Sequence, residues 1–240
     1  MAEANKRTSG VFISFEGGDG AGKSTHLNFV AESLRRRGEE VVCLREPGGT
    51  IIGEQLRNVV LDPGNYLMKD ECELLIYEAA RAQLVFQVIK PALERGAIVL
   101  CDRFFDSTVA YQVYGRGLDR EFITRANEFA CQGVCPDRTI LMMTGGDAEL
   151  GLERATHHKH ADRLEMAGVD FHERVNHGYR LLAETHPDRV RIVVSNATKE
   201  ETARKVFAQL SDIFPYMGDE TLCTIDYFKS LVSSRYERRF

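Results

Sequence analysis

The stretch GGDGAGKST at residues 17–25 follows directly after an apolar run at residues 11–16 (VFISFE). Its first eight residues fit the pattern G-x-x-x-x-G-K-[S/T], which is typical of a loop between a buried strand and a helix. Glycines let the backbone approach phosphate oxygens closely, so that successive N–H groups converge on an anion. The helix that follows presents its unpaired N–H groups and positive dipole end to the same phosphates. The sequence therefore predicts a site for a nucleoside triphosphate.

The side chains of this loop suit a triphosphate and its metal ion. We expect the Lys23 ammonium, on an exposed loop, to reach the β- and γ-phosphates and to act in catalysis. The Ser24 hydroxyl can ligate Mg²⁺ directly, and Mg²⁺ is the cofactor that the pattern implies. The predicted ATP-binding residues of the loop are Gly17, Gly18, Asp19, Gly20, Ala21, Gly22, Lys23, Ser24 and Thr25.

Five continuous apolar runs alternate with long helical segments, which indicates strands that are buried on both faces. Strands and helices in alternation produce right-handed crossovers and a parallel sheet with helices on both faces. We therefore expect an α/β fold built on a five-stranded parallel sheet. The strands are predicted at residues 11–16, 40–45, 97–102, 139–143 and 190–195, and helices from residue 23 to about 38 and over 70–95.

The composition fits one globular domain, because the chain has 240 residues, of which 43% are hydrophobic and 28% are charged. No run approaches the ~18 apolar residues of a membrane span, and the polar start lacks the apolar core of a signal peptide. The formal charge of -5 gives no bulk attraction to nucleic acid. We expect a cytoplasmic protein with no membrane and no nucleic-acid partner. The chain is predicted to have three parts. These are a polar tail at 1–10, a domain at 11–213 that contains the phosphate-binding loop at residues 17–25 (the P-loop), and a helical C-terminal extension at 214–240.

The six cysteines include no C-x-x-C pair. Cys43 and Cys101 lie in apolar runs, where a cysteine behaves as a small buried hydrophobe. Cys131 and Cys135 lie one helical turn apart. We interpret the cysteines as reduced and structural, rather than as a disulfide framework or a metal site.

Charged residues stand at the carboxyl ends of two predicted strands, where open parallel sheets bind ligands. The second strand ends in Arg45, and the guanidinium fork suits a phosphate. The third strand ends in Asp102 and Arg103. We expect Asp102 to hold Mg²⁺ through water, and Arg103 to bridge the donor and acceptor phosphates in catalysis. No N-K-x-D segment of a guanine-binding protein is present, and the length suits a kinase with a small acceptor.

These motifs together resemble the thymidylate kinase family, which phosphorylates dTMP with ATP. Such a resemblance implies a fold of the nucleoside monophosphate kinase type with a short mobile lid, and a homodimer packed through helices. The segments that carry it cover about residues 11–213 in the family's order: FEGGDGAGKST (15–25), REPGGT (45–50), VVLD (59–62), YEAARAQL (77–84), DRFFDSTVAYQVYGRG (102–117), PDRTILMM (136–143) and DRLE (162–165).

The resemblance also implies the residues that bind dTMP. Arg45 and Arg103 match the arginines that hold the acceptor's phosphate, and Asp19 matches the acidic residue that meets its 3′-hydroxyl. Arg81 matches the residue that hydrogen-bonds the thymine carbonyl, and Tyr77, one helical turn earlier, matches the ring that stacks on the base. The base and sugar would be lined by Ser107, Thr108, Tyr111 and Gln112.

The lid, at about residues 154–165, departs from the arginine-rich pattern that the family's P-loop type usually has. It carries His157, His158 and His160 around Lys159, with arginines only at its edges. Because the P-loop holds Asp19 and no arginine, we expect the lid to supply a cation. Arg163 is the first choice as catalytic and ATP-binding residue, and Arg154 is the second choice for ATP binding. The fourth strand departs too, since it continues as Thr144-Gly145-Gly146, where the family usually carries an Asp.

The sequence thus predicts transfer of the γ-phosphoryl group of ATP to dTMP, giving dTDP and ADP in dTTP biosynthesis. Two rival hypotheses stay open at this point. One is a kinase for another acceptor, such as a deoxynucleoside or a different monophosphate. The other is a nucleotide-binding module that has lost catalysis and acts through residues 214–240.

Overall fold

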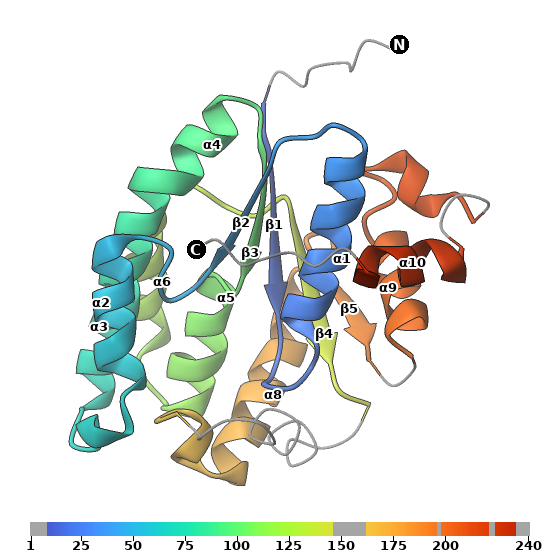
Figure 1. Cartoon of the computed structure of the whole chain (residues 1–240). Coiled ribbons are helices and arrows are strands. Elements are labelled where there is room, and N and C mark those ends of the chain that lie inside the picture. The colour runs from blue at the N-terminus through green and yellow to red at the C-terminus, as the bar shows by residue number, and fades with distance from the viewer. Residues whose placement is uncertain (1–8, 146–161, 196–197, 221–223, 234–240) are drawn as a thin grey trace.

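A computed structural model describes residues 9–145, 162–195, 198–220 and 224–233 of the chain. Its centre is a five-stranded sheet with every neighbouring pair of strands parallel, in the order β2-β3-β1-β4-β5 (Figure 1). The prediction of a parallel α/β fold is therefore confirmed. The strands are β1 (Val11–Glu16), β2 (Val41–Arg45), β3 (Ile98–Asp102), β4 (Arg138–Met143) and β5 (Val190–Val194).

The two faces of the sheet carry separate hydrophobic clusters, because successive side chains of a strand point to opposite faces. Ile13 and Phe15 of β1 pack with the cluster that includes Phe29 and Phe207, whereas Phe12 packs with Val99 in the other cluster. All of these side chains are buried. Burial on both faces explains the apolar sequences of the inner strands β1, β3 and β4. The expectation of burial on both faces is wrong for the edge strand β5, where Ile192 and Val194 are 44% and 37% exposed.

Helices cover both faces of the sheet, and Figure 1 shows α1 on the side of α9 and α10. The long segment predicted as one helix over 70–95 is helical throughout but includes a π-helical stretch, η2. The helices are α1 (Lys23–Arg36), α2 (Ile51–Leu61), α3 (Asp70–Leu84), η2 (Val85–Ile89), α4 (Lys90–Glu94), α5 (Phe105–Thr108), η3 (Val109–Gly115), α6 (Arg120–Cys131), α8 (Val169–Thr185), α9 (Lys199–Ala208) and α10 (Ile225–Ser233), with short 3₁₀ turns η1 (Pro63–Asn65), η4 (Glu165–Ala167) and η5 (Pro215–Gly218).

The parallel arrangement brings the carboxyl ends of β1, β2 and β3 to one edge of the sheet. β1 ends at the P-loop, β2 ends at Arg45, and β3 ends at Asp102. Residues 154–161 of the predicted lid lie outside the described residues, as does residue 146 after the fourth strand. In the described part of the chain, none of the helices combines the length and apolar character that crossing a bilayer requires.

Candidate functional site

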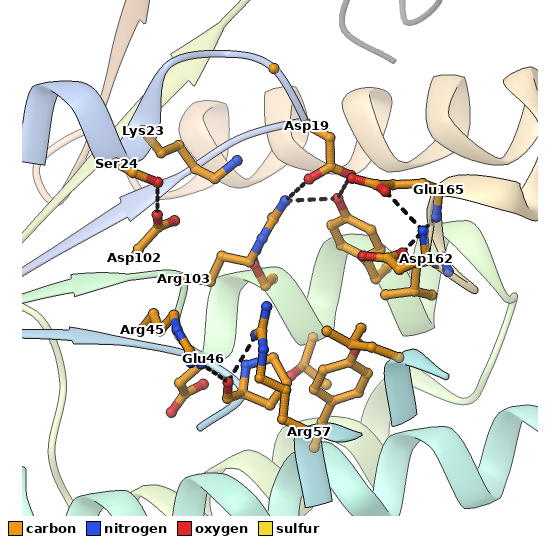
Figure 2. A pocket seen from close by; sticks show the side chains of 18 of the residues that line it. Asp19, Lys23, Ser24, Arg45, Glu46, Arg57, Asp102, Arg103, Asp162 and Glu165 are labelled. Carbon is orange, nitrogen blue, oxygen red and sulfur yellow. Dashed lines mark hydrogen bonds and ion pairs between the residues drawn. The ribbon is translucent and has the colours of Figure 1, made fainter. Parts of the chain in front are cut away.

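A cavity of about 560 Å³ opens at the carboxyl ends of β1, β2 and β3. Its volume lies within the range that small-molecule sites usually have. Charged and aromatic side chains from the P-loop, the strand ends and the helices α2, α3 and η3 converge on it (Figure 2). Its lining is Asp19, Gly20, Gly22, Lys23, Ser24, Thr25, Arg45, Glu46, Pro47, Arg57, Leu61, Tyr77, Arg81, Asp102, Arg103, Ser107, Thr108, Tyr111, Gln112, Asp162, Leu164 and Glu165.

The P-loop has the backbone conformation of an anion site. Gly17 has φ 129°, and a Cβ placed there would lie 1.9 Å from the Met142 carbonyl oxygen, so only glycine fits. Gly22, with φ 90°, is the N-cap of α1 and has no side chain that could cap the helix. The first turn of α1 carries no acidic residue. The helix N-terminus is therefore left open toward an anion.

Lys23 is buried rather than exposed, which corrects the expectation from the sequence. The residue is 8% exposed. Nζ donates to the carbonyl oxygens of Gly17 at 3.1 Å and of Gly18 at 2.8 Å, so the lysine folds back over its own loop. Burial and the nearby Arg103 lower the Lys23 pKa, against the opposing effect of Asp19.

Ser24 and Asp102 form the oxygen pair expected of a magnesium site. Ser24 Oγ donates to Asp102 Oδ2 at 2.5 Å (Figure 2), and both residues line the cavity. Mg²⁺ prefers hard oxygen ligands and usually keeps several waters, so a hydroxyl and one carboxylate beside substrate phosphates suit it. The described residues hold no cluster of three or more His, Cys, Asp or Glu that could bind a metal without the substrate.

Arg103 is held at the centre of the cavity in a strained conformation. Its φ of 73° lies in the left-handed region, which costs a non-glycine residue about 1–3 kcal/mol. Nη2 pairs with Asp19 Oδ1 at 2.6 Å and donates to Tyr111 Oη at 3.1 Å. Burial raises the Asp19 pKa, but Arg103 and Lys23 outweigh it and lower that pKa to about 2. Asp19 is therefore a charged acceptor at neutral pH.

Glu16, the last residue of β1, fixes the turn that carries Arg103. Glu16 Oε1 accepts the Phe104 backbone N–H at 2.7 Å. Its Oε2 accepts from Ser107 Oγ at 2.6 Å and from Tyr179 Oη at 2.9 Å. Burial, with a smaller contribution from Asp106, raises the Glu16 pKa to about 7. A buried carboxyl group that accepts three hydrogen bonds determines the position of the residues around it.

Two arginines converge on one carbonyl group at the edge of the cavity. Arg45 Nη1 donates to the Pro47 oxygen at 3.0 Å, and Arg57 Nη1 donates to the same oxygen at 2.9 Å. Glu54 pairs with Arg45 at 2.9 Å. Burial and the neighbouring Arg45 lower the Arg57 pKa. This crowding of positive charge favours an anionic ligand between the two guanidinium groups.

Arg81 is almost fully buried, with 2% of its surface exposed. Glu46 Oε2 accepts from its Nε at 2.9 Å and from its Nη2 at 2.7 Å. Its Nη1 donates to Glu78 Oε1 at 2.8 Å, Thr108 Oγ1 at 2.9 Å and Asn127 Oδ1 at 2.8 Å. Because Nη2 carries two hydrogens and has one acceptor among the described residues, one N–H remains for a ligand.

Two glutamates, Glu46 and Glu78, share the single positive charge of Arg81. Glu46 and Glu78 each have one buried carboxylate oxygen with no hydrogen-bond partner among the described residues. Burial raises the Glu46 pKa to about 7, although Arg81 lowers it. The guanidinium is thus an essential counter-charge inside the protein as well as a part of the cavity wall.

The remaining residues assigned to dTMP also lie in the wall. Tyr77 and Gln112 line the cavity, and Gln112 Nε2 donates to Glu73 Oε1 at 2.8 Å. Burial and Glu73 raise the Tyr77 pKa, so its hydroxyl stays protonated. The structure therefore brings together the nine residues assigned to dTMP from the sequence: Asp19, Arg45, Tyr77, Arg81, Arg103, Ser107, Thr108, Tyr111 and Gln112.

Arg163 is not among the residues that line the cavity. Its Nη2 pairs with Glu73, and its Nε donates to the Val60 carbonyl oxygen at 2.9 Å. Arg154 and Lys159, the other candidates for the lid's cation, lie outside the described residues. A catalytic role for Arg163 stays a prediction, and it requires the guanidinium to leave Glu73.

Several lining residues were not assigned a role from the sequence. Glu46 and Pro47 lie in REPGGT, and Asp162 and Glu165 lie in DRLE, so both segments already pointed to them. Asp162 Oδ1 accepts the Glu165 N–H at 3.0 Å, and Glu165 Oε2 accepts the Asp162 N–H at 3.0 Å. Arg57 belongs to neither segment. Only the packing of α2 against the cavity reveals it.

Comparisons with known proteins agree with this geometry. The sequence model of thymidylate kinase matches residues 15–206. The thymidylate kinase of an Exiguobacterium species is 46% identical over 186 residues, which cover 76% of this chain and 85% of that protein. The thymidylate kinase of Trichlorobacter lovleyi is 42% identical over 200 residues, which cover 82% and 94%.

A solved structure is similar as well. The crystal structure of thymidylate kinase from Ehrlichia chaffeensis matches with a TM-score of 0.67 and 30% sequence identity. The match covers 84% of this chain and 98% of that chain. The likeness therefore extends over most of this chain.

Proposed function

The chain belongs to the thymidylate kinase family; it phosphorylates dTMP to dTDP with ATP, and we propose that the cavity residues described above divide this reaction among them. The observation that supports the assignment best is the cluster of Asp19, Arg103 and Tyr111 directly beside the P-loop. This cluster combines a cation with a charged acceptor, which supports the proposal that the two substrates meet beside it.

We propose that dTMP lies with its phosphate between the strand ends and its base toward α3. Arg45, Arg57 and Arg103 would hold the phosphate, since all three guanidinium groups line the cavity. The free N–H of Arg81 would donate to a base carbonyl, and the Tyr77 ring would offer a stacking face. Asp19 would accept from the sugar hydroxyl.

The donor phosphates would lie on the P-loop and the N-terminus of α1. Lys23 would exchange its carbonyl acceptors for phosphate oxygens, and Ser24 with Asp102 would hold Mg²⁺, directly and through water respectively. When bound, Mg²⁺ neutralises charge on the phosphates. The acceptor phosphate is already an oxyanion, so positioning and charge neutralisation are what this chain's residues contribute. The lid's cation would come from Arg154, Lys159 or Arg163, and the protein would act in the cytoplasm.

Tyr111 provides a test of how the sugar is placed. We expect Tyr111→Ala to relax the preference for dTMP over its ribose analogue, because the ring's bulk would exclude a 2′-hydroxyl. Tyr111→Phe keeps the ring and loses the contacts of the hydroxyl with Arg103 and Asp19. It should therefore retain the preference. The measurement is the ratio of kcat/KM for the two acceptors, and an unchanged ratio in the alanine variant would refute the placement.

We propose that the protein is a homodimer that packs through α3 and α6. Leu75 and Phe86 lie on one stripe of the α3–η2 helix, 56% and 69% exposed. Phe129 on the neighbouring α6 is 84% exposed. Large apolar side chains grouped on one face are typical of an association surface.

We expect Phe129→Arg to convert the dimer to a monomer, because a buried unpaired charge opposes association. Sedimentation velocity of the variant and the parent protein measures this. Ile225→Arg on α10 is the matched control, since Ile225 is an exposed apolar residue of another helix. A parent protein that sediments as a monomer, or a Phe129→Arg variant that stays dimeric, contradicts the proposed interface.

The acceptor is tested by comparing turnover with dTMP, dUMP, UMP, dCMP, dAMP and thymidine. The proposal requires dTMP to have the highest kcat/KM. Preference for another monophosphate or for thymidine would support the first rival hypothesis instead.

A further inference from the structure

The C-terminal part of the chain lies beyond the family match and yet forms part of the core. The match to the sequence model of thymidylate kinase ends at residue 206. Beyond it, η5 and α10 follow, and α10 contacts both α1 and α9 (Figure 1). The helix α1 begins at the P-loop, so this late segment touches the element on which ATP binding depends.

Phe228 of α10 is fully buried at the junction of these three helices. Its ring meets the Phe207 ring of α9 edge to face, with centroids 4.9 Å apart. It meets the Phe29 ring of α1 in the same way at 6.3 Å. Aromatic pairs in this geometry contribute specific orientation in addition to the burial of apolar area.

Polar contacts fix the same helices along the following turns of α1. Tyr227 Oη donates to Ser33 Oγ at 2.6 Å. Arg36 donates to Ser230 through two nitrogens, to Oγ at 2.8 Å and to the carbonyl oxygen at 2.9 Å. Because apolar and polar contacts both occur, α10 has one defined position on α1 rather than a loose apolar contact.

The contacts continue from Phe29 to the P-loop through His26. The His26 ring lies 5.7 Å from the Phe29 ring, centroid to centroid. His26 Nδ1 is 2.8 Å from the Gly22 carbonyl oxygen, and Nε2 is 3.3 Å from the Lys199 carbonyl oxygen at the start of α9. His26 itself is 4% exposed. An unbroken series of packed side chains therefore joins Phe228 to the glycine that caps α1.

We propose that α10 positions the P-loop for ATP, with Phe228 as the positioning residue that acts through Phe29 and His26. Residues 15–206 supply the chemistry, and the segment after them holds α1 in the orientation that this chemistry needs. The inference rests on the proposed function, since it assigns ATP to the P-loop. A positioning role of α10 differs from simple stabilisation of the fold. It requires that loss of the Phe228 contacts weaken the binding of ATP and leave the binding of dTMP nearly unchanged.

The test is Phe228→Leu in the full chain, which keeps an apolar side chain at the junction but removes both ring contacts. We expect the Kd for ATP, measured by calorimetric titration well below Tm, to rise by roughly 3- to 30-fold, the range of measured couplings between distant sites. The Kd for dTMP should change by less than about twofold, because Asp19 is the only proposed acceptor residue on the P-loop and the others lie on other elements. Tyr227→Phe, which removes one hydrogen bond, should shift the ATP Kd in the same direction by less.

Ile89→Ala is the matched control, since Ile89 is fully buried in the cluster on the other face of the sheet. It should lower Tm while leaving both Kd values unchanged. An unchanged ATP Kd in Phe228→Leu, or equal losses of both substrates, overturns the proposal, as does an equal rise of the ATP Kd in Ile89→Ala. If Phe228→Leu does not fold, the Kd values of Tyr227→Phe for ATP and dTMP decide. An unchanged ATP Kd, or equal losses of both substrates, then overturns the proposal.

This design separates the inference from the proposed function. ATP binding is measured without turnover, so a parent protein that binds ATP but does not phosphorylate dTMP would refute the function alone. A selective loss of ATP affinity in the variant would still support the positioning role of α10.

Discussion

Lys23→Ala is expected to lower kcat by about 10²–10³-fold or more, because a single group that stabilises transition-state charge contributes on this scale. Lys23 is the first residue of α1, and its ammonium group donates to carbonyl oxygens of the P-loop itself. In the complex it would neutralise the phosphoryl group as it moves from ATP. The KM for dTMP should change little, since we propose that Arg45, Arg57 and Arg103 hold the acceptor phosphate.

The measurement is a steady-state kinase assay with Tm as the control for folding. Tm matters because Lys23 is buried, so its removal could also disturb the loop. Lys205→Ala is a matched control, since Lys205 also donates to a backbone carbonyl, that of Val194 at 3.4 Å, but lies on the surface. A Lys23→Ala variant with near-normal kcat would contradict the role of the P-loop in this chain.

Arg81→Ala is expected to lower the free energy of unfolding by about 3–5 kcal/mol, because it leaves Glu46 and Glu78 as buried carboxylates without their counter-charge. For a chain of this length the loss corresponds to a fall in Tm of about 6–20 °C. The variant should also bind dTMP more weakly, by about 1.5–3 kcal/mol for one lost charged hydrogen bond. Its affinity for ATP should change little.

The two effects of Arg81 are separated by a second substitution. Arg81→Ala combined with Glu46→Gln removes one of the buried charges, so it should recover part of the stability without recovering dTMP binding. Thermal unfolding and titration with each nucleotide measure this. If Arg81→Ala kept the parent's Tm, the buried charge cluster would be misassigned. If both nucleotides lost affinity equally, Arg81 would have a structural role alone.

Much of the fold follows from local sequence, since each strand is rich in apolar residues and the P-loop marks the end of the first one. The carboxyl ends of parallel strands meet at one edge, so the order of the motifs along the chain was enough to place Arg45, Asp102 and Arg103 together. The resemblance to the family added Arg81 and Tyr77, which strand and helix patterns alone do not distinguish from core residues.

The pairing of charged side chains could not be predicted in the same way. Whether Arg163 meets a phosphate or Glu73 depends on distances between segments about ninety residues apart. The burial of Lys23 depends on how the P-loop folds over its own carbonyl groups. The place of Arg57 in the cavity wall follows only from its contact with Pro47. The sequence gives no sign of it, because an arginine on a helix usually lies in solvent.

The most direct test of the account is the product of the reaction with ATP, Mg²⁺ and dTMP together. We predict that ADP forms only when dTMP is present, in equal amounts with dTDP, and that removal of Mg²⁺ with a chelator stops both. Separation of the nucleotides by ion-exchange chromatography measures all four species in one sample. ADP formation that does not depend on dTMP, or no ADP at all, would contradict the account and favour a different acceptor or a protein that only binds nucleotides.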